Sequence, residues 1–273
     1  MRTIPCSTYR LQLNSDFTFE DASAVLIYLR DLGVSHVYCS PYLQAAPGST
    51  HGYDVVDPQR VNEELGGEAA HRSFSQRVKE LGLGQILDIV PNHMAIGPQN
   101  LYWWDVLENG PSSRYAAWFD IDWQSSEVKL QNKILIPVLG DQYGRVLASG
   151  EIRIMEIDFT FQVHYGEHRF PLAPRSIAGI LRKANEFAAD STLGFLSDSL
   201  ARLPSPDSTD PLLLQERHRD KDVIYAMIKR LCGEHSNVCA AIGKALIEIN
   251  ADVDQVDALL NLQNYRLAYW RTA

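Results

Sequence analysis

The sequence contains 273 residues with a mass of 30.7 kDa, of which 45% are hydrophobic and 22% are charged. These values are ordinary for a globular protein and exclude collagen-like, disordered and coiled-coil chains. The 34 acidic and 25 basic side chains give a net charge of −9, so the chain repels phosphate backbones and we expect no nucleic acid among its partners.

The first ninety residues alternate between predicted strands and helices. Residues 7–13 alternate polar and apolar side chains, as a strand does. Thr18 is a favourable N-cap, and the helix that it begins is expected to stop at Gly33. The elements predicted next are a strand over 34–39, a long loop over 40–66, a helix around 74–81 and a buried strand over 85–90. This order is typical of a parallel α/β sheet or barrel.

The pattern changes after the first ninety residues. The stretch 100–123 is rich in aromatic residues and has little periodicity. Residues 133–170 combine turn signals with period-two alternation, which predicts a β-meander. The rest of the sequence is helical in pattern and ends in a predicted helix over 254–270. We therefore divide the chain into three β/α units over 1–94, an aromatic and β-rich part over 95–175, and a helical part over 176–273.

The sequence shows no membrane or disulfide signals. No stretch approaches 18 consecutive apolar residues and the N-terminus lacks a signal-peptide pattern, so we expect a cytoplasmic protein with no membrane partner. The cysteines are too sparse for a disulfide scaffold and lack zinc-site spacing, which predicts free, mostly buried thiols at Cys6, Cys39, Cys232 and Cys239.

The most distinctive polar motif is Asp88-Ile89-Val90-Pro91-Asn92-His93, at the end of the third predicted barrel strand. In a β/α barrel the carboxyl ends of the strands carry the active site. Asp88 interrupts an apolar strand, and because an unpaired buried carboxylate is costly it must meet a donor, an ion or a ligand. Asn92 and His93 follow at the same edge and can hydrogen-bond sugar hydroxyls. The alternative is a structural carboxylate with a satisfied surface histidine.

A second polar cluster lies in the loop after the second predicted strand, at the same edge of the sheet. Tyr53 offers a flat face on which a sugar ring can stack, and Asp54 and His51 can hold hydroxyl groups. Gly52 allows close approach of the backbone. The alternative is an ordinary polar loop with a packed tyrosine. Two such clusters at one edge favour a binding site over two unrelated structural features.

The order of these motifs resembles the start of the α-amylase family of β/α barrels, and in detail it resembles the maltooligosyl trehalose synthases. The motifs that carry the closer resemblance are STYRLQL, SPYLQAAPGSTHGYDVVDP, DIVPNHMAI, WFDIDW, KILIPVLGDQYG and YRLAYWRTA. They occur in this order along the whole chain. The resemblance implies an α/β fold: about three β/α units from the N-terminal part of a TIM-type barrel, followed after strand three by a mixed β-meander and helical insertion.

The resemblance also implies roles for single residues. Asp88 supports the site electrostatically, and His93, next to Asn92, binds hydroxyls of the sugar at the cleavage subsite. Tyr53 stacks under that sugar. The aromatic residues of the insertion are either glucan platforms or, more commonly for buried aromatics, core residues: Trp103, Trp104, Trp118 and Trp123.

The implied activity is that of a (1→4)-α-D-glucan 1-α-D-glucosylmutase. Such an enzyme converts the reducing-end α-1,4 link of a maltooligosaccharide or glycogen-derived dextrin into an α,α-1,1 trehalose link, with no metal and no cofactor. Retaining chemistry of this kind needs a carboxylate nucleophile and a carboxyl acid/base about 5–5.5 Å apart. The Arg-x-Asp motif of the nucleophile is missing here, so we expect both catalytic residues beyond Ala273, in a longer enzyme of which this chain alone is inactive.

Two other functions stay open at this point. One is another α-amylase-family glucan hydrolase, against which the STYRLQL and YRLAYWR motifs argue. The other is a non-catalytic glucan-binding fragment, which the aromatic residues and the missing carboxylates favour. The sequence does not indicate whether the chain is a monomer or an oligomer.

Overall fold

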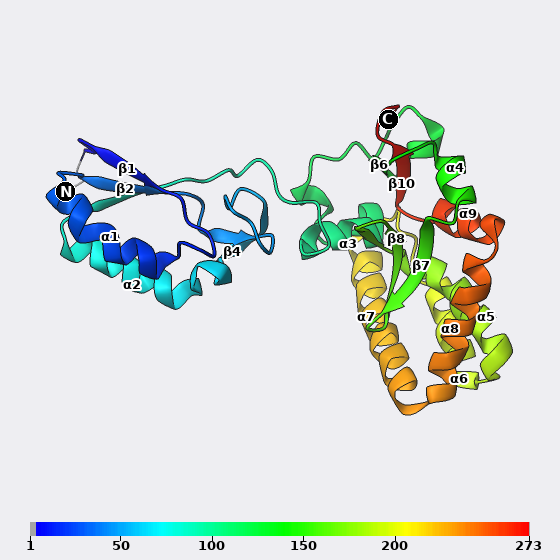
Figure 1. The fold of residues 1–273 in the computed structure, drawn as a ribbon. Coiled ribbons are helices and arrows are strands. Elements are labelled where there is room, and N and C mark those ends of the chain that lie inside the picture. The colour runs from blue at the N-terminus through cyan, green and yellow to red at the C-terminus, as the bar shows by residue number, and fades with distance from the viewer. Residues whose placement is uncertain (1–3, 273) are drawn as a thin grey trace. The chain divides into compact units, whose positions relative to one another are not determined.

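The computed structural model describes residues 4–272 and divides the chain into two compact units, with the division between Leu101 and Tyr102 (Figure 1). The division into three parts, 1–94, 95–175 and 176–273, stays a prediction. In chain order, unit 1 contains β1 (Thr8–Leu11), α1 (Phe19–Asp31), β2 (His36–Cys39), β3 (Leu43–Ala45), β4 (Val55–Val61), the 3-10 turn η1 (Glu63–Leu65), α2 (Gly67–Glu80) and β5 (Gly84–Leu87).

Unit 1 is built on a parallel sheet with the strand order β1-β2-β5. Figure 1 shows α1 and α2 lying side by side against one face of this sheet. The core on that face contains Phe19 and Phe74 from the helices and Val37 from β2, all fully buried. The start of α1 is fixed as predicted at Thr18, whose backbone N–H donates to the Asp21 carboxylate at 2.9 Å.

The predicted strand and helix order of unit 1 is confirmed, but two details were wrong. The segment predicted as a long loop contains an antiparallel pair, β3 and β4, and the turn η1. The strand predicted over 85–90 ends at Leu87, which is 57% exposed instead of buried. The reason is that β5 forms an edge of the described sheet, so it lacks a neighbouring strand on one side. Residues 4–272 accordingly contain an open α/β unit with a three-stranded parallel sheet and no closed barrel.

Unit 2 joins a small sheet region to a bundle of helices. Its elements are α3 (Leu101–Asn109), the 3-10 turns η2 (Gly110–Ser112), η3 (Ala116–Trp118) and η4 (Val128–Leu130), β6 (Ile134–Leu139), α4 (Tyr143–Ala148), β7 (Ile152–Ile157), β8 (Thr160–Tyr165), β9 (His168–Pro171), α5 (Pro174–Ala188), α6 (Ser191–Ala201), α7 (Pro211–Glu234), α8 (Ser236–Asn250), α9 (Val253–Asn261) and β10 (Tyr265–Tyr269).

The predicted β-meander is confirmed for the antiparallel strands β7, β8 and β9. Asp158 and Phe159 form the two-residue turn between the first two strands, both with positive φ, as a tight hairpin requires. Helix α8 packs against β7, where the Asn250 side chain accepts from the Ile154 N–H at 2.8 Å and donates to its carbonyl at 2.7 Å. Asn250 thus supplies β7 with the hydrogen bonds of a neighbouring strand.

The prediction of a helix over 254–270 was wrong in its second half. Helix α9 ends at Asn261, and β10 then pairs in parallel with β6, so β6 lies outside the meander. Two buried amide side chains hold the connection: Gln263 accepts from the Ala173 N–H at 2.6 Å, and Asn264 donates to the Glu108 carbonyl at 2.7 Å. These long-range bonds outweigh the helical spacing of the local sequence. A short helix, α4, also stands where turns were predicted.

All four cysteines are free thiols, but only two are buried as predicted. Cys39 and Cys232 are buried, whereas Cys6 and Cys239 are exposed. Burial raises the pKa of the Cys39 thiol and raises that of Cys232 to about 11, so both remain protonated at neutral pH.

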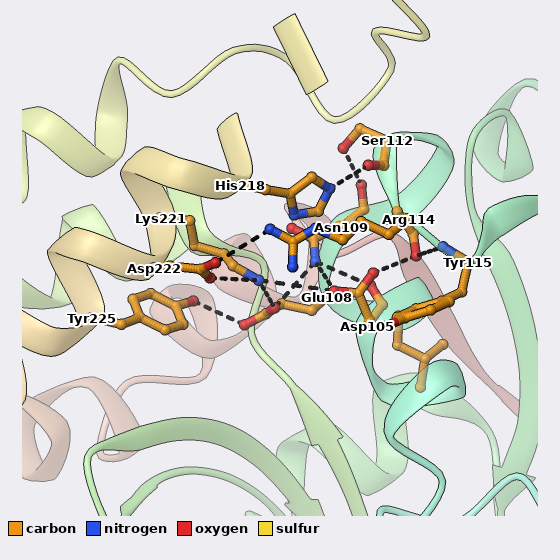
Figure 2. A network of polar contacts seen from close by, with 12 residues as sticks. Asp105, Glu108, Asn109, Ser112, Arg114, Tyr115, His218, Lys221, Asp222 and Tyr225 are labelled. Carbon is orange, nitrogen blue, oxygen red and sulfur yellow. Dashed lines mark hydrogen bonds and ion pairs between the residues drawn. The ribbon is translucent and has the colours of Figure 1, made fainter. Parts of the chain in front are cut away.

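A buried polar network ties α3 to α7 (Figure 2). Lys221 donates to one carboxylate oxygen of Glu108 at 2.6 Å, and the Tyr225 hydroxyl donates to the other at 3.0 Å. The Lys221 and Glu108 side chains are only 8% and 10% exposed. His218 adds a contact at 2.8 Å with the carbonyl of Ser112. Because these partners are more than 100 residues apart in sequence, the network fixes the packing of α3 on the bundle.

We expect Lys221→Met to lower the free energy of unfolding of unit 2 by about 3 kcal/mol, because Glu108 would keep a buried charge without its cation. The double variant Glu108→Gln/Lys221→Met should be more stable than the single one. Urea denaturation followed by tryptophan fluorescence measures this, since all five tryptophans lie in unit 2. As the control, Arg114→Gln breaks an exposed pair with Asp222 and should cost less than about 1 kcal/mol. Equal losses in both single variants would contradict the argument.

Candidate functional site

The predicted carboxylate Asp88 lies directly after β5 and is held by three donors from different parts of unit 1. Its Oδ2 atom accepts from Arg10 Nη1 at 2.6 Å, from the Tyr53 hydroxyl at 2.6 Å and from the Tyr38 hydroxyl at 3.1 Å. The Asp88 side chain is 13% exposed. All three bonds reach the same oxygen, so among the described residues Oδ1 has no hydrogen-bond donor. Asp88 therefore keeps one acceptor for a ligand.

The strand register explains why these groups meet. Arg10 of β1 is paired with Tyr38 of β2, and Tyr38 with Ile86 of β5. Side chains alternate along a strand, so these residues lie on the face opposite to Val37, which is buried under the helices. Asp88 follows Ile86 by two residues and continues the same face. The Arg10 guanidinium also lies over the Tyr38 ring, 4.4 Å from its centroid.

The network keeps Asp88 ionised. Burial by itself would raise the pKa of Asp88, but the hydrogen bonds from Tyr53, Arg10 and Tyr38 outweigh it and the pKa lies below its usual value. The hydrogen bond to Asp88 raises the pKa of the Tyr53 phenol, despite the opposing effect of Arg10, so this hydroxyl stays protonated and donates. The site at neutral pH is a carboxylate and a guanidinium whose charges cancel.

Tyr53 is placed by the loop between β3 and β4. Arg10 Nη2 donates to its hydroxyl at 2.9 Å, and the His93 ring nitrogen Nε2 lies 3.1 Å from its carbonyl oxygen. The His51 ring stacks beside the Tyr53 ring, with centroids 5.9 Å apart. Gly52 has φ of +78°, and a Cβ there would lie 2.9 Å from the Pro41 carbonyl oxygen, so this turn requires glycine.

A pocket with a volume of about 240 Å³ lies beside this network, at the carboxyl ends of the strands. Its walls are mostly apolar, and its polar groups come from Tyr53, Asp88 and His93. Apolar walls with a few polar groups are typical of a small-molecule site. Three of the six predicted site residues thus line one pocket.

The other three predicted residues lie differently. His51 stacks on Tyr53 but is exposed and outside the pocket lining. Asp54 accepts a short hydrogen bond from the Ser49 hydroxyl, which gives it a partner within the loop. Asn92 is exposed and does not line the pocket. The structure does not bring these three into the pocket, and their binding roles stay predictions.

Sequence reasoning missed Arg10 and Tyr38. The signal was present for Arg10, because a cation in the middle of a predicted strand is as costly without a partner as the carboxylate at Asp88. The same alternation that predicted the strand also predicts that Arg10 and Leu11 point to opposite faces. For Tyr38 no local signal distinguishes a ligand of Asp88 from an ordinary core tyrosine.

Of the four predicted aromatic platforms, Trp118 is 52% exposed. It stacks on Tyr102 with centroids 5.0 Å apart, and it meets Tyr115 edge-on at 5.0 Å. Trp103 instead packs against the core of unit 2. Trp118 is therefore the exposed member of an aromatic cluster in unit 2 whose two tyrosines are half-buried, while Trp103 has the structural role.

Within residues 4–272, no group of three or more histidine, cysteine or acidic side chains is arranged to hold a metal ion. No helix in that range is long and apolar enough to cross a bilayer.

Comparisons with known proteins first define a class. The family model of the α-amylase catalytic domain matches residues 22–145, which include most of α1 and all of β2, the Tyr53 loop and the Asp88 motif. This agrees with a parallel α/β sheet that carries polar residues at the carboxyl ends of its strands.

Individual relatives define the similarity more closely. Over 177 residues the chain is 43% identical to a Mycobacterium tuberculosis protein named as a maltooligosyl trehalose synthase, in a match that covers 62% of this chain and 22% of that protein. The solved structure of the DSM5389 glycosyltrehalose synthase has a TM-score of 0.62 at 30% identity, over 98% of this chain and 27% of that one. The solved structure of the Arthrobacter ramosus maltooligosyltrehalose synthase has a TM-score of 0.56 at 41% identity, over 63% of this chain and 22% of that one.

These matches confirm the resemblance that the sequence motifs indicated: the chain is similar to maltooligosyl trehalose synthases of the α-amylase family. The chain spans about a quarter of the length of these relatives.

We expect Asp88→Asn to remove a pH-dependent part of the stability of unit 1. The folded pKa of Asp88 is lower than its unfolded value of about 4, so its contribution is fully present above pH 4 and is lost as the pH falls through the folded pKa. Amide hydrogen exchange in β1 and β5, corrected for the intrinsic effect of pH, should show this loss on acidification in the unchanged chain and a weaker one in Asp88→Asn. The control Asp31→Asn removes an exposed carboxylate from α1. An unaltered acid profile in Asp88→Asn would contradict the argument.

Proposed function

We propose that this chain is the N-terminal portion of a maltooligosyl trehalose synthase and that unit 1 supplies glucan-binding residues to its active site. The observation that carries the proposal is the network of Arg10, Tyr38, Tyr53 and Asp88 beside a pocket at the carboxyl ends of parallel strands. The similarity to trehalose synthases over most of the chain supports the same conclusion.

In this proposal β1, β2 and β5, with their helices, are the first three β/α units of a TIM-type barrel. Their parallel order supports it, as does the exposed edge at β5, where a further parallel strand would pair in a barrel. Unit 2 would then be the mixed β-meander and helical insertion after strand three.

The substrate in this proposal is a maltooligosaccharide or glycogen-derived dextrin. The Tyr53 ring provides an apolar face for a sugar, and Asp88 Oδ1 and His93 are available for its hydroxyls. The longer enzyme would convert the reducing-end α-1,4 link into an α,α-1,1 link, by intramolecular transglycosylation. The nucleophile and the acid/base would come from outside this chain, because the pocket of unit 1 contains the single carboxylate Asp88 and the reaction needs two.

Product analysis on the longer enzyme separates this activity from glucan hydrolysis. A trehalose synthase produces non-reducing trehalosyl dextrin, whereas a hydrolase releases new reducing ends. Clear turnover of maltopentaose by the 273-residue chain alone would show that the chemistry is complete without further carboxylates, and would overturn this part of the proposal.

We expect Tyr53→Ala to raise the Kd for maltopentaose at least about tenfold, because the stacking face is lost. Tyr53→Phe keeps the ring and removes the hydroxyl that holds Asp88, so it should weaken binding less. Calorimetric titration of the 273-residue chain measures both. Tyr28→Ala removes a 63% exposed tyrosine from α1 and serves as the control. Equal affinity in Tyr53→Ala and the unchanged chain would place the glucan elsewhere.

A further inference from the structure

Unit 2 contains a pocket with a volume of about 550 Å³ that gathers three arginines. Arg175 and Arg182 come from α5, and Arg217 comes from the second turn of α7. The rest of the pocket wall includes the segment 205–207 and Leu262, which follows the end of α9. Neither the proposed glucan site nor the sequence motifs involve these residues.

Arg217 is the buried member of this group. It is 1% exposed, and its Nη1 atom donates to the Pro204 carbonyl at 2.5 Å. Its Nε atom is buried and has no hydrogen-bond partner among the described residues. The nearby carboxylate of Glu108 is bonded to Lys221 and Tyr225 and makes no hydrogen bond or ion pair with Arg217 in the described structure. A buried donor without an acceptor is costly, so the charge of Arg217 is compensated only in part by its hydrogen bond to the Pro204 carbonyl.

The other two arginines are exposed and, within residues 4–272, form no ion pair. They are seven residues apart on α5, which is two helical turns, so they lie on one face of the helix. This helix begins at Pro174 and has no acidic residue in its first turn. The positive end of the helix dipole therefore adds to the charge of the guanidinium groups.

One carboxylate, Asp207, lines the pocket. It accepts a hydrogen bond from the Ser205 hydroxyl at 3.4 Å. Glu and Asp side chains other than Asp207 do not line the pocket in the described structure. Three guanidinium groups against one carboxylate leave the pocket with an excess of two positive charges. This excess is out of keeping with a chain of net charge −9.

We propose that this pocket binds a phosphate-type oxyanion, either inorganic phosphate or the phosphate group of a small molecule. Guanidinium groups match a tetrahedral oxyanion through paired N–H donors, and a helix N-terminus contributes to the same interaction. The buried Arg217 is what distinguishes this pocket from a patch of surface arginines. Burial lowers the pKa of Arg217 against the opposing effects of Glu108 and Tyr225, and Arg175 lowers it further. A bound anion would stabilise the charged form of both arginines.

Calorimetric titration of the 273-residue chain at constant ionic strength tests the proposal with three probes. Inorganic phosphate and glucose 6-phosphate should each bind saturably, whereas glucose should not bind at this pocket. Equal affinity for the two phosphates identifies free phosphate as a sufficient ligand. Tighter binding of glucose 6-phosphate identifies a phosphorylated sugar. Absence of saturable binding of both phosphates up to about 10 mM, the weak end of the affinity scale, would overturn the proposal.

Variants locate the binding. Arg175→Gln and Arg182→Gln remove exposed side chains, so we expect both to fold, and tryptophan fluorescence checks this in unit 2. Each should raise the Kd for phosphate about tenfold. The control Arg230→Gln removes the same charge from an exposed position of α7, thirteen residues beyond Arg217. An equal effect of Arg230→Gln, or no effect of the two pocket variants, would overturn the proposal. Maltopentaose binding, measured in parallel, should be unchanged, so failure here is distinguishable from failure of the proposed function.

Discussion

A carboxylate at the end of β5 has to be paired, and the parallel register of three strands supplies its partners. Asp88 cannot be taken out of water alone, because an unpaired buried charge costs several kcal/mol. Arg10 and Tyr38 reach it because β1, β2 and β5 are in step. A shift of the register by one residue would turn both side chains to the face that α1 and α2 cover. The pairing of the strands and the electrostatics of the site are therefore one constraint.

The buried pair of unit 2 obeys the same physics with a different outcome. Both oxygens of Glu108 accept hydrogen bonds, from Lys221 and from Tyr225, so neither is left for a ligand. In unit 1 all three donors converge on one oxygen of Asp88 and leave the other free beside a pocket. A carboxylate whose two oxygens are both bonded serves packing, whereas an open acceptor beside a pocket is suited to a ligand. The number of unused acceptors thus separates the structural carboxylate from the proposed binding one.

Local sequence predicted what depends on near neighbours. The cap at Thr18, the alternation in β1 and the meander of β7 to β9 all arise within a few residues. It failed where the decisive partner is remote: β10 has helical spacing, but its partner β6 lies some 130 residues earlier and fixes it as a strand. The candidate site divides in the same way. The cost of a buried charge indicated Asp88, while its partner Arg10, 78 residues away, became visible in the fold.

Charge distinguishes the ligands that the two pockets suit. Arg10 of unit 1 is neutralised by Asp88, so the pocket beside them presents hydrogen-bonding groups and an aromatic face but no net charge. Such a surface suits an uncharged ligand rich in hydroxyls, since a sugar offers both apolar C–H faces and donors for the free carboxylate oxygen. The three arginines that line the unit 2 pocket form no ion pair with a carboxylate among the described residues. Because an unpaired guanidinium recovers most energy from an anion, that pocket would bind a neutral sugar poorly and an oxyanion well. Whether an arginine is paired with a carboxylate, more than whether it is present, therefore decides which class of ligand a pocket selects.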